Sequence, residues 1–407
     1  MSRVTRQRTA ANPEPAENRR TFLNRTGRAG AGLTLSSWLP GGWSAIAADT
    51  PSSQIVHTQS PLNSEPQLGA LAKSWITPVE SFYVRSHAPN PKIDPAAFRL
   101  EVEGLVDKPL SLSLAELSGS FAETSVIATM TCAGNRRSEH SLVKPVGGVP
   151  WQAGAIGNAR WGGVRLSEVL KKAGLKEGAK HVWFEGLDEI SKGGGIIPFG
   201  ASIPVSKAMT DTEAMPGALL TTKMNGQPLN ADHGAPLRGV VPGYIGARSV
   251  KWLGKIVVSD RPSPNHYVAT AYKLVQEGTP LEWDEGGPIY RFPLNSVICQ
   301  PAADSKVSTG KLAVAGYAYP SGRPGTTVAK VEVSSDEGRT WTTAKITSPI
   351  RERCWVLWKA DVKVSSSASE LIVRATDSRG DTQPENAEWN MKGYMFNGWY
   401  HVPVDAS

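Results

Sequence analysis

The sequence contains few cysteines, and this scarcity excludes several classes of protein. Its 407 residues include only Cys132, Cys299 and Cys354, too few for a fold held together by disulfide bonds. Cys299 and Cys354 could form one bridge in an oxidising compartment, but two buried free thiols are the favoured interpretation. The sequence has no Cys-x-x-Cys-His site for attaching a c-type haem, and its Cys and His residues lack the spacing of a zinc site.

The chain also has little net charge outside its first 48 residues, although the whole carries +7. Residues 1–48 hold seven arginines, no lysine and two acidic residues, a net charge of +5. The other residues hold 37 basic and 35 acidic side chains, a net charge of +2. Binding to nucleic acid needs positive charge gathered on the folded part, so we expect no nucleic-acid partner.

A long apolar run is absent as well. The weakly apolar stretch 29–47 is broken by Pro40 and two glycines, and is too polar for a membrane-spanning helix. It follows Asn-Arg-Arg-Thr-Phe-Leu at 18–23, which resembles a twin-arginine export motif, and it ends on the small-x-small sequence 45–47. We therefore expect residues 1–48 to be a twin-arginine signal peptide, with the mature protein in the bacterial periplasm and free of the membrane. A disordered basic tail is the alternative.

The most informative stretch is 131–139, Thr-Cys-Ala-Gly-Asn-Arg-Arg-Ser-Glu. It follows the apolar, β-branched run 125–130, which predicts a buried strand. Small residues let the backbone approach a ligand closely, and two arginines beside a thiol favour the thiolate, which is both a nucleophile and a metal ligand. The arginines could also hold an oxyanion. An ordinary buried cysteine beside two surface arginines is the alternative that this local pattern leaves open.

The hexapeptide 132–137, Cys-Ala-Gly-Asn-Arg-Arg, resembles the signature of the sulfite oxidase family of molybdenum enzymes. The resemblance implies a molybdenum–molybdopterin cofactor (Moco) with the Cys132 thiolate as the protein's ligand to molybdenum. A thiolate is the soft ligand that such a centre takes. The similarity runs in family order over residues 75–403, and we expect no haem in this chain.

A second family-like stretch lies at 81–89, a short aromatic strand followed by a Pro-rich loop. Arg85 and His87 occupy alternate positions, which face the same side of a strand. By resemblance, Arg85 faces the substrate, and Tyr83, Val84, Arg85, Ser86 and His87 contact the pterin. Ser86 stands where family members commonly have asparagine, which puts one hydrogen bond in doubt. An edge strand with solvated polar residues is the alternative.

Further positions match the family singly. By resemblance, Trp151 lines the substrate pocket and Tyr272 is the substrate-site tyrosine, preceded by Ala271 where vertebrate members have an acidic residue. The implied cofactor contacts are Asp188, His233, Arg238, Ser249, Val250 and Lys251. Taken alone, Trp151 would be a packed surface anchor, Asp188 a turn cap, and His233 and Arg238 solvated loop residues. Fixed donors in a Gly/Pro loop are nevertheless what a phosphate cradle needs.

The predicted fold is a strand-rich α+β structure. Residues 49–75 are expected to form an extended arm, Ser113 to cap a helix with Glu116, and Gly174 to end a helix with apolar positions 166, 169, 170 and 173. Five short strands between 314 and 376 predict an immunoglobulin-like sandwich. We therefore expect a signal peptide at 1–48 and an immunoglobulin-like domain at 299–407. By resemblance to the family, residues 49–298 are a molybdopterin-binding catalytic domain and residues 299–407 a dimerisation domain, which implies a homodimer.

The function implied by the resemblance is oxidation of sulfite to sulfate by oxygen-atom transfer. Arg85 and Arg137 would neutralise the sulfite, Tyr272 would donate a hydrogen bond, Trp151 would wall the pocket, and Arg136 would serve structure or cofactor. Electrons would pass to a separate c-type cytochrome or cupredoxin. The alternatives are a sulfur dehydrogenase subunit or a sulfoxide reductase of the same fold, a nitrate reductase, a Cys–His hydrolase, and a non-catalytic periplasmic binding protein.

Overall fold

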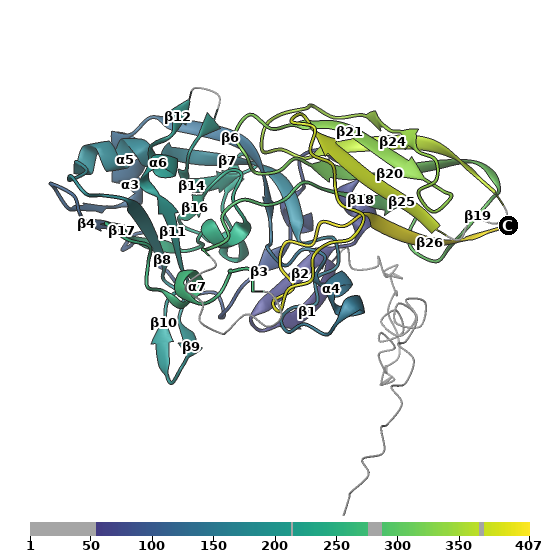
Figure 1. The fold of residues 1–407 in the computed structure, drawn as a ribbon. Coiled ribbons are helices and arrows are strands. Elements are labelled where there is room, and N and C mark those ends of the chain that lie inside the picture. The colour runs from purple at the N-terminus through teal and green to yellow at the C-terminus, as the bar shows by residue number, and fades with distance from the viewer. Residues whose placement is uncertain (1–53, 213–214, 276–286, 366–369) are drawn as a thin grey trace, which may run out of the picture. The chain divides into compact units, whose positions relative to one another are not determined.

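Strands dominate the protein, as expected for a strand-rich α+β fold. The computed structural model describes residues 54–407 apart from 213–214, 276–286 and 366–369 (Figure 1). These residues belong to one compact unit, Ser52–Ser407, and the predicted signal peptide lies outside them. Within the described part, no helix is long and apolar enough to cross a membrane.

The first element that the structure describes is a hairpin, where the sequence predicted an extended arm. Strands β1 (Gln54–Gln59) and β2 (Leu62–Pro66) pair antiparallel, and β2 also pairs with β3 (Val84–Arg85). The prediction was wrong because the polar residues of this segment are buried: Asn63 and Glu65 are 2% and 0% exposed. The short aromatic strand expected within 81–89 consists of the two residues of β3, preceded by the 3₁₀ turn η1 (Val79–Ser81).

Two five-stranded sheets form the catalytic half. The first has the order β11-β8-β17-β4-β5 and contains β4 (Leu100–Gly104), β5 (Leu110–Leu112), β8 (His181–Gly186), β11 (Gly200–Pro204) and β17 (Leu253–Ser259). The second has the order β15-β14-β7-β6, with β16 also paired to β14; it contains β6 (Glu123–Thr131), β7 (Ile156–Arg165), β14 (Leu219–Met224), β15 (Gln227–Pro228) and β16 (Arg238–Val240). Two small ribbons are β9 (Ile190–Lys192) with β10 (Gly195–Ile197) and β12 (Asp211–Thr212) with β13 (Met215–Pro216).

The helices are short. Ser113 caps α3 in the predicted capping box with Glu116, and Gly174 follows the last residue of α5. Apolar side chains of α5 and the first sheet share one core, because Leu166, Val169 and Leu170 of the helix are completely buried. The helical elements are α2 (Leu68–Leu71), α3 (Leu114–Ser120), α4 (Arg137–Val143), α5 (Leu166–Ala173), α6 (Val205–Met209), η2 (Ala231–His233), η3 (Gly246–Arg248) and α7 (His266–Ala269).

The C-terminal part is a β-sandwich, as predicted. One sheet has the order β18-β20-β24-β23 and the other β19-β26-β25-β21-β22, and valines from both sheets, such as Val314 and Val373, meet in one core. The strands are β18 (Asn295–Gln300), β19 (Ser305–Val307), β20 (Gly310–Tyr319), β21 (Val328–Ser334), β22 (Thr342–Thr343), β23 (Lys345–Ile346), β24 (Val356–Val364), β25 (Glu370–Asp377) and β26 (Tyr400–Ala406).

The connection between the two parts runs through β18. This strand pairs with β20 of the sandwich from Asn295 onward, so the predicted boundary between residues 298 and 299 falls inside a strand. Cys299 lies on this strand, and both it and Cys354 are buried free thiols, as the sequence favoured. Burial raises the pKa of the Cys354 thiol to about 12.

Candidate functional site

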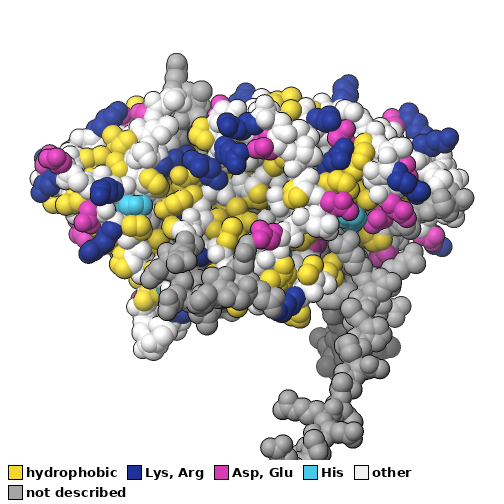
Figure 2. Space-filling model, in the orientation of Figure 1, with side chains coloured by type: hydrophobic (Ala, Val, Ile, Leu, Met, Phe, Trp, Pro, Cys, Tyr) yellow, Lys and Arg dark blue, Asp and Glu magenta, His cyan; other side chains and the backbone are white. Residues whose placement is uncertain are grey.

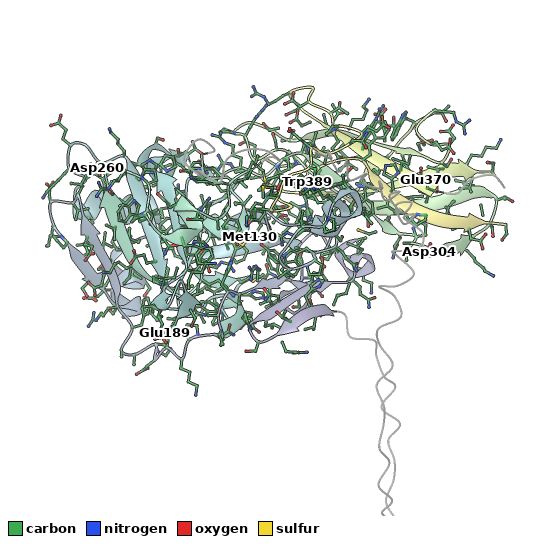
Figure 3. The ribbon with its side chains drawn as sticks, turned by 60° about the horizontal axis from the view of Figure 1, so that its bottom comes forward. Met130, Glu189, Asp260, Asp304, Glu370 and Trp389 are labelled. Carbon is green, nitrogen blue, oxygen red and sulfur yellow. The ribbon has the colours of Figure 1, made fainter. Side chains whose placement is uncertain are left out.

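Cys132 lies where β6 ends, at the start of the turn that leads into α4. Its thiol is almost buried, at 8% exposed for the whole residue, and the backbone N–H of Gly134 donates to its Sγ over 3.4 Å. The backbone N–H of Cys132 donates to the carbonyl of Ala155. Met130, two residues earlier, is labelled near the middle of the side-chain view in Figure 3. The predicted strand and turn therefore place the thiol inside the molecule.

A pocket with about 630 Å³ of empty space opens at this thiol. It collects residues from β3, the turn after β8, the loop around η2, the segment after η3 and the segment after α7. Eleven of the predicted site residues line it: Tyr83, Arg85, Ser86, His87, Cys132, Asp188, His233, Arg238, Ser249, Lys251 and Tyr272. Residues far apart in the sequence thus meet around one cavity.

One wall of the pocket carries basic side chains that are almost buried. His233 and Arg238 are 3% and 6% exposed, and burial lowers the pKa of Arg238 to about 10. Burial and the nearby Arg238 also lower the pKa of His233 to about 4. Burial lowers the pKa of Lys251 well below its usual value. This wall would therefore be stabilised by an anion.

Arg238 is incompletely paired. Its Nη1 and Nη2 donate to the backbone carbonyls of His233 (3.1 Å) and Ser249 (3.4 Å), and the guanidinium lies 5.3 Å from the ring centre of Trp161. Its buried Nε has no partner in the described structure. A buried donor without a partner costs stability, so this atom is free to serve a ligand.

The Arg85 region is held by the N-terminal hairpin. Asn63 Oδ1 accepts hydrogen bonds from Arg85 Nη1 (3.0 Å) and from the backbone N–H of Ser86 (3.1 Å). Ser86 Oγ accepts from Lys251 Nζ over 2.6 Å. The serine that replaces the family's usual asparagine therefore anchors a lysine of the pocket.

Tyr272 and His87 meet on another wall. The Tyr272 hydroxyl lies 3.2 Å from His87 Nε2, and Tyr272 adopts a positive φ of 55°. Burial, with the Arg85 charge in addition, lowers the pKa of His87 well below its usual value, which keeps the imidazole neutral. Burial raises the pKa of Tyr272, so the hydroxyl keeps its proton and can donate it in a hydrogen bond.

Arg137 and Trp151, both predicted at the substrate, do not line this pocket. Arg137 Nε and Nη1 donate to the carbonyls of Lys392 (3.0 Å) and Val149 (2.8 Å). Its guanidinium nevertheless covers the Cys132 turn, because a Cβ on Gly134 would lie 2.5 Å from Arg137 Nη2. Trp151 is completely buried.

The position of Trp151 has a clear physical cause. Its ring packs edge-on against His57, at 5.0 Å between ring centres, and against Tyr83 at 6.5 Å. Tyr83 itself lines the pocket, which places Trp151 in the layer behind it. Val84 and Val250 are buried and also do not line the cavity.

Asp188 combines both of the roles considered for it. It lines the pocket, and its Oδ1 accepts the backbone N–H of Phe199 over 3.0 Å, as a turn cap does. Burial raises the pKa of this carboxyl. Phe199 stacks on His87 at 4.7 Å between ring centres, so Asp188 also fixes a ring of the pocket wall.

Arg136 is structural, as its predicted role allowed. It is completely buried, and its Nε and Nη2 donate to the two carboxylate oxygens of Glu139 (2.6 and 2.8 Å). Nη1 reaches Asn295 Oδ1 (2.6 Å) and the carbonyl of Gly398 (2.8 Å), and Nη2 also reaches Trp399 O. One arginine thereby connects the Cys132 turn to β18 of the sandwich and to residues 398–399.

Sequence reasoning missed several contributors to the site. Tyr394, between β25 and β26, stacks on Tyr272 at 5.3 Å between ring centres, and its ring centre lies 5.2 Å from the Arg137 guanidinium carbon. Glu65 accepts the backbone N–H groups of Gln152 and Gly154, each at 2.7 Å, and pairs with His57 Nε2 at 2.7 Å. No local pattern marks either residue, because each acts on a segment remote in sequence. The pocket wall also includes Phe82, Phe199, Asp232, Gly246, Ala247 and Trp252.

The residues present fit a molybdenum–pterin group bearing a phosphate. Among the described residues, no cluster of three His, Cys, Asp or Glu side chains could hold a metal ion, whereas Cys132 offers one soft thiolate ligand to a metal held mainly by its own organic ligand. The unpaired Arg238 Nε, with Lys251 and His233 beside it, suits an anionic group. Cys132 would ligate the metal, and the basic wall would hold the phosphate.

Comparison with known proteins agrees with this geometry. Residues 87–267 match the model of the oxidoreductase molybdopterin-binding domain, and residues 287–407 match that of the Mo-co oxidoreductase dimerisation domain. The chain is 42% identical to sulfite oxidase from Gallus gallus, over 85% of this chain and 76% of that protein. It is 38% identical to sulfite oxidase from Arabidopsis thaliana, over 85% of this chain and 92% of that protein.

A solved structure extends the comparison to three dimensions. Sulfane dehydrogenase SoxCD from Paracoccus pantotrophus superposes with a TM-score of 0.72 at 26% sequence identity, covering 92% of this chain and 98% of that one. The fold, both matched domains and the relatives at about 40% identity agree with each other. The chain belongs to the sulfite oxidase family of molybdopterin-binding oxidoreductases.

Proposed function

We propose that this protein oxidises sulfite to sulfate with a molybdenum–molybdopterin cofactor bound in the pocket at Cys132. The observation that carries the proposal is the meeting of one thiol with a basic, incompletely paired wall around the same cavity. Similarity to sulfite oxidases of animals and plants supports the substrate. In the net reaction, sulfite gains one oxygen from water and releases two electrons and two protons.

The bound cofactor supplies the two-electron oxygen-atom transfer, and the chain's own residues position and neutralise. Cys132 ligates the metal, while Arg238, His233 and Lys251 hold the phosphate. Arg85 attracts and orients the sulfite anion, and such a charged hydrogen bond contributes roughly 1.5–3 kcal/mol. Tyr272 stays protonated and donates a hydrogen bond.

Arg137 would join Arg85 at the substrate by turning its guanidinium away from one backbone carbonyl. Its contacts with Lys392 and Val149 leave Nη2 beside Gly134, close to the thiol. Trp151 would then support the pocket from behind Tyr83 instead of walling it. This assignment follows the family resemblance and the covering of the Cys132 turn by Arg137.

The proposal includes the protein's setting. The twin-arginine-like stretch 18–23 supports export of the folded, loaded enzyme to the periplasm. A c-type cytochrome or cupredoxin would collect the electrons singly. The match of residues 287–407 to a dimerisation domain supports a homodimer. Sedimentation of the purified mature protein at twice the chain mass would support the dimer, and a monomer at micromolar concentration would refute it.

A second candidate function comes from the structural similarity to sulfane dehydrogenase SoxCD. A protein with that activity would act on sulfane sulfur instead of free sulfite. Turnover of both substrates by the purified enzyme separates the two functions: a preference for sulfite supports our proposal, and a preference for a protein- or thiol-bound sulfane sulfur replaces it.

The first experiment combines molybdenum content, by mass spectrometry, with sulfite-dependent reduction of ferricyanide. Wild type should hold nearly one molybdenum per chain and turn over sulfite. Removing a residue that only supports a metal ligand typically lowers metal affinity or activity by about 10- to 100-fold. Cys132→Ser removes the metal ligand itself, so its molybdenum content and sulfite turnover should fall by more than that.

Cys354→Ala is the matched control, because Cys354 is another buried free thiol, and it donates a hydrogen bond to the carbonyl of Ile127. It should keep both molybdenum and turnover. Folded wild type without molybdenum after expression with sufficient cofactor would sink the proposal, and molybdenum without sulfite turnover would move the substrate to another oxyanion or sulfoxide.

A further inference from the structure

A second group of basic side chains lies where the catalytic half meets the sandwich. Three segments supply it: Lys207 on α6, Arg291 before β18 and Arg353 before β24. All three approach residues 242–244. Lys207 Nζ donates to the carbonyl of Pro242 over 2.9 Å, and the Arg291 backbone forms an isolated bridge with that of Tyr244. In Figure 2 several lysine and arginine side chains gather between the α6 region and the sandwich.

Close packing of backbone brings Arg353 into the group. A Cβ on Gly243 would lie 3.3 Å from Arg353 Cδ and 2.9 Å from the carbonyl oxygen of Gly322. A Cβ on Gly322 would in turn lie 3.2 Å from Arg291 Cβ. The side chains of Arg291 and Arg353 therefore leave the same narrow junction.

Arg353 lacks partners although it is buried. It is 5% exposed, and its Nε and Nη1 have no hydrogen-bond partner in the described structure. Among the described residues, no carboxylate lies within ion-pair distance of Lys207, Arg291 or Arg353. Burying a charge without an opposite charge is costly, and placing like charges together adds to the cost.

Lys207 is surrounded mainly by positive charge. Burial lowers its pKa to about 7, and the charges of Arg353 and Arg291 contribute. The Tyr244 ring centre lies 5.1 Å from Lys207 Nζ. Glu352 is the acidic group that acts on Arg353, from outside ion-pair distance. Without a ligand, the group holds more positive charge than its surroundings neutralise.

We propose that Lys207, Arg291 and Arg353 form a binding site for a tetrahedral oxyanion, sulfate or phosphate, distinct from the pocket at Cys132. The planar guanidinium of Arg353 supplies unpaired donors suited to such an anion. Lys207 is half-buried and Arg291 is exposed, so these two side chains are accessible from solvent, whereas Arg353 is buried. Residues 242–244 lead directly into η3 and the pocket wall, and Arg353 O accepts the backbone N–H of Thr129 on β6, three residues before Cys132.

Thermal unfolding of the cofactor-loaded protein tests the site. Sodium sulfate, sodium phosphate and sodium chloride are compared at pH 6 and equal ionic strength. Occupation at about ten times the dissociation constant should raise the Tm by about 2 °C in sulfate or phosphate over chloride. Arg353→Met and Lys207→Met should lose this rise, and in chloride each should be at least as stable as wild type, because repulsion is relieved.

Two controls separate this site from the pocket. Arg85→Met removes a charge at the Cys132 pocket and should keep the anion-specific rise, while Arg339→Met removes an exposed surface arginine and should also keep it. Three results would each overturn the proposal: a rise in Tm as large as that of wild type in both Arg353→Met and Lys207→Met, a rise lost only in Arg85→Met, or a rise in chloride equal to that in sulfate or phosphate.

The apparent affinity for the anion should be weaker at pH 8.5 than at pH 6, because Lys207 loses its proton above pH 7. Equal affinity at the two pH values would contradict the role of Lys207.

If both anions raise the Tm, the site prefers the anion that reaches half of its maximal effect on the Tm at the lower concentration. Selenate, which replaces sulfate and scatters anomalously, gives an independent reading in a crystal. An anomalous peak between Lys207 and Arg353 is the expected result. A peak confined to the Cys132 pocket would overturn the second site.

Discussion

Arg136 and Arg238 are both buried arginines beside the Cys132 strand, but they are paired in opposite ways. Arg136 donates to both oxygens of Glu139, to Asn295 and to two backbone carbonyls. Arg238 reaches two carbonyls and a methionine sulfur, and its Nε has no partner in the described structure. Burial by itself lowers the pKa of Arg136, but Glu139, with Tyr400 and Tyr317, raises it by more, so the net shift is upward. Burial lowers the pKa of Arg238.

The difference teaches how to separate structural charges from binding charges. A buried arginine whose donors are all satisfied holds segments together, and removing it leaves its partners unpaired. A buried arginine whose N–H groups lack hydrogen-bond partners destabilises the ligand-free protein, and a ligand that accepts those hydrogen bonds removes this cost. Arg353, with two unpaired nitrogens, falls in the second group, and this is the basis of the proposed anion site.

The largest expected effect is on stability at Arg136. Arg136→Met should lower the free energy of unfolding by about 3–5 kcal/mol, because it leaves Glu139 as an uncompensated, mostly buried charge. The loss should be measured by denaturant unfolding with and without cofactor, and it should occur in both forms. Arg99→Met is the matched control: its ion pair with Glu116 is about half exposed, and exposed pairs of this kind contribute little to stability. Equal losses of unfolding free energy in Arg136→Met and Arg99→Met would contradict the structural role of Arg136.

The next effect concerns cofactor binding at Arg238. Arg238→Met should weaken retention of the molybdopterin by roughly 10- to 150-fold, the equivalent of one charged hydrogen bond of 1.5–3 kcal/mol. The cofactor-free protein should lose little stability, since the arginine has no carboxylate partner there. Pterin and molybdenum released during dialysis provide the measurement. A variant that unfolds without cofactor as readily as Arg136→Met would show that Arg238 is structural.

The last effect is a pH dependence of stability to which His233 contributes. Its pKa in the folded protein is about 4, below the usual value of about 6.5, so the unfolded chain takes up the proton first. The contribution of His233 to the stability of the cofactor-free protein is therefore complete above pH 6.5, and it is lost as the pH drops toward 4. His233→Asn should reduce this slope in urea midpoints measured across the range. An unchanged slope would show that His233 is not the group responsible.

The sequence predicted the elements that obey local rules. The capping box at Ser113, the glycine after α5, the buried strand before Cys132 and the sandwich strands follow from short-range pattern. The prediction failed for residues 54–66, because a polar segment does not reveal that its side chains are buried against backbone donors of other segments. β18 and β26 were missed for a related reason, since their partners are remote in the chain.

The candidate site divides in the same way. Cys132, Arg85, His233, Arg238 and Lys251 could be named from motifs, and the structure brings them to one pocket. Asn63, Glu65 and Tyr394 could not be named, because each acts across a contact between segments distant in sequence. The family resemblance also placed Trp151 at the cavity surface, whereas packing puts it one layer behind.

By itself, the sequence determined the chemistry available: one thiol at a strand end, basic residues in glycine-rich turns, and too few cysteines for a disulfide scaffold or a zinc site. The tertiary structure alone decided which charges are paired and which are left for ligands. That choice depends on desolvation and on distances across the fold, and neither is encoded in the spacing of residues along the chain. Arg136 and Arg353 are the same residue type and both are buried, and only their surroundings make one a structural residue and the other a member of the proposed anion site.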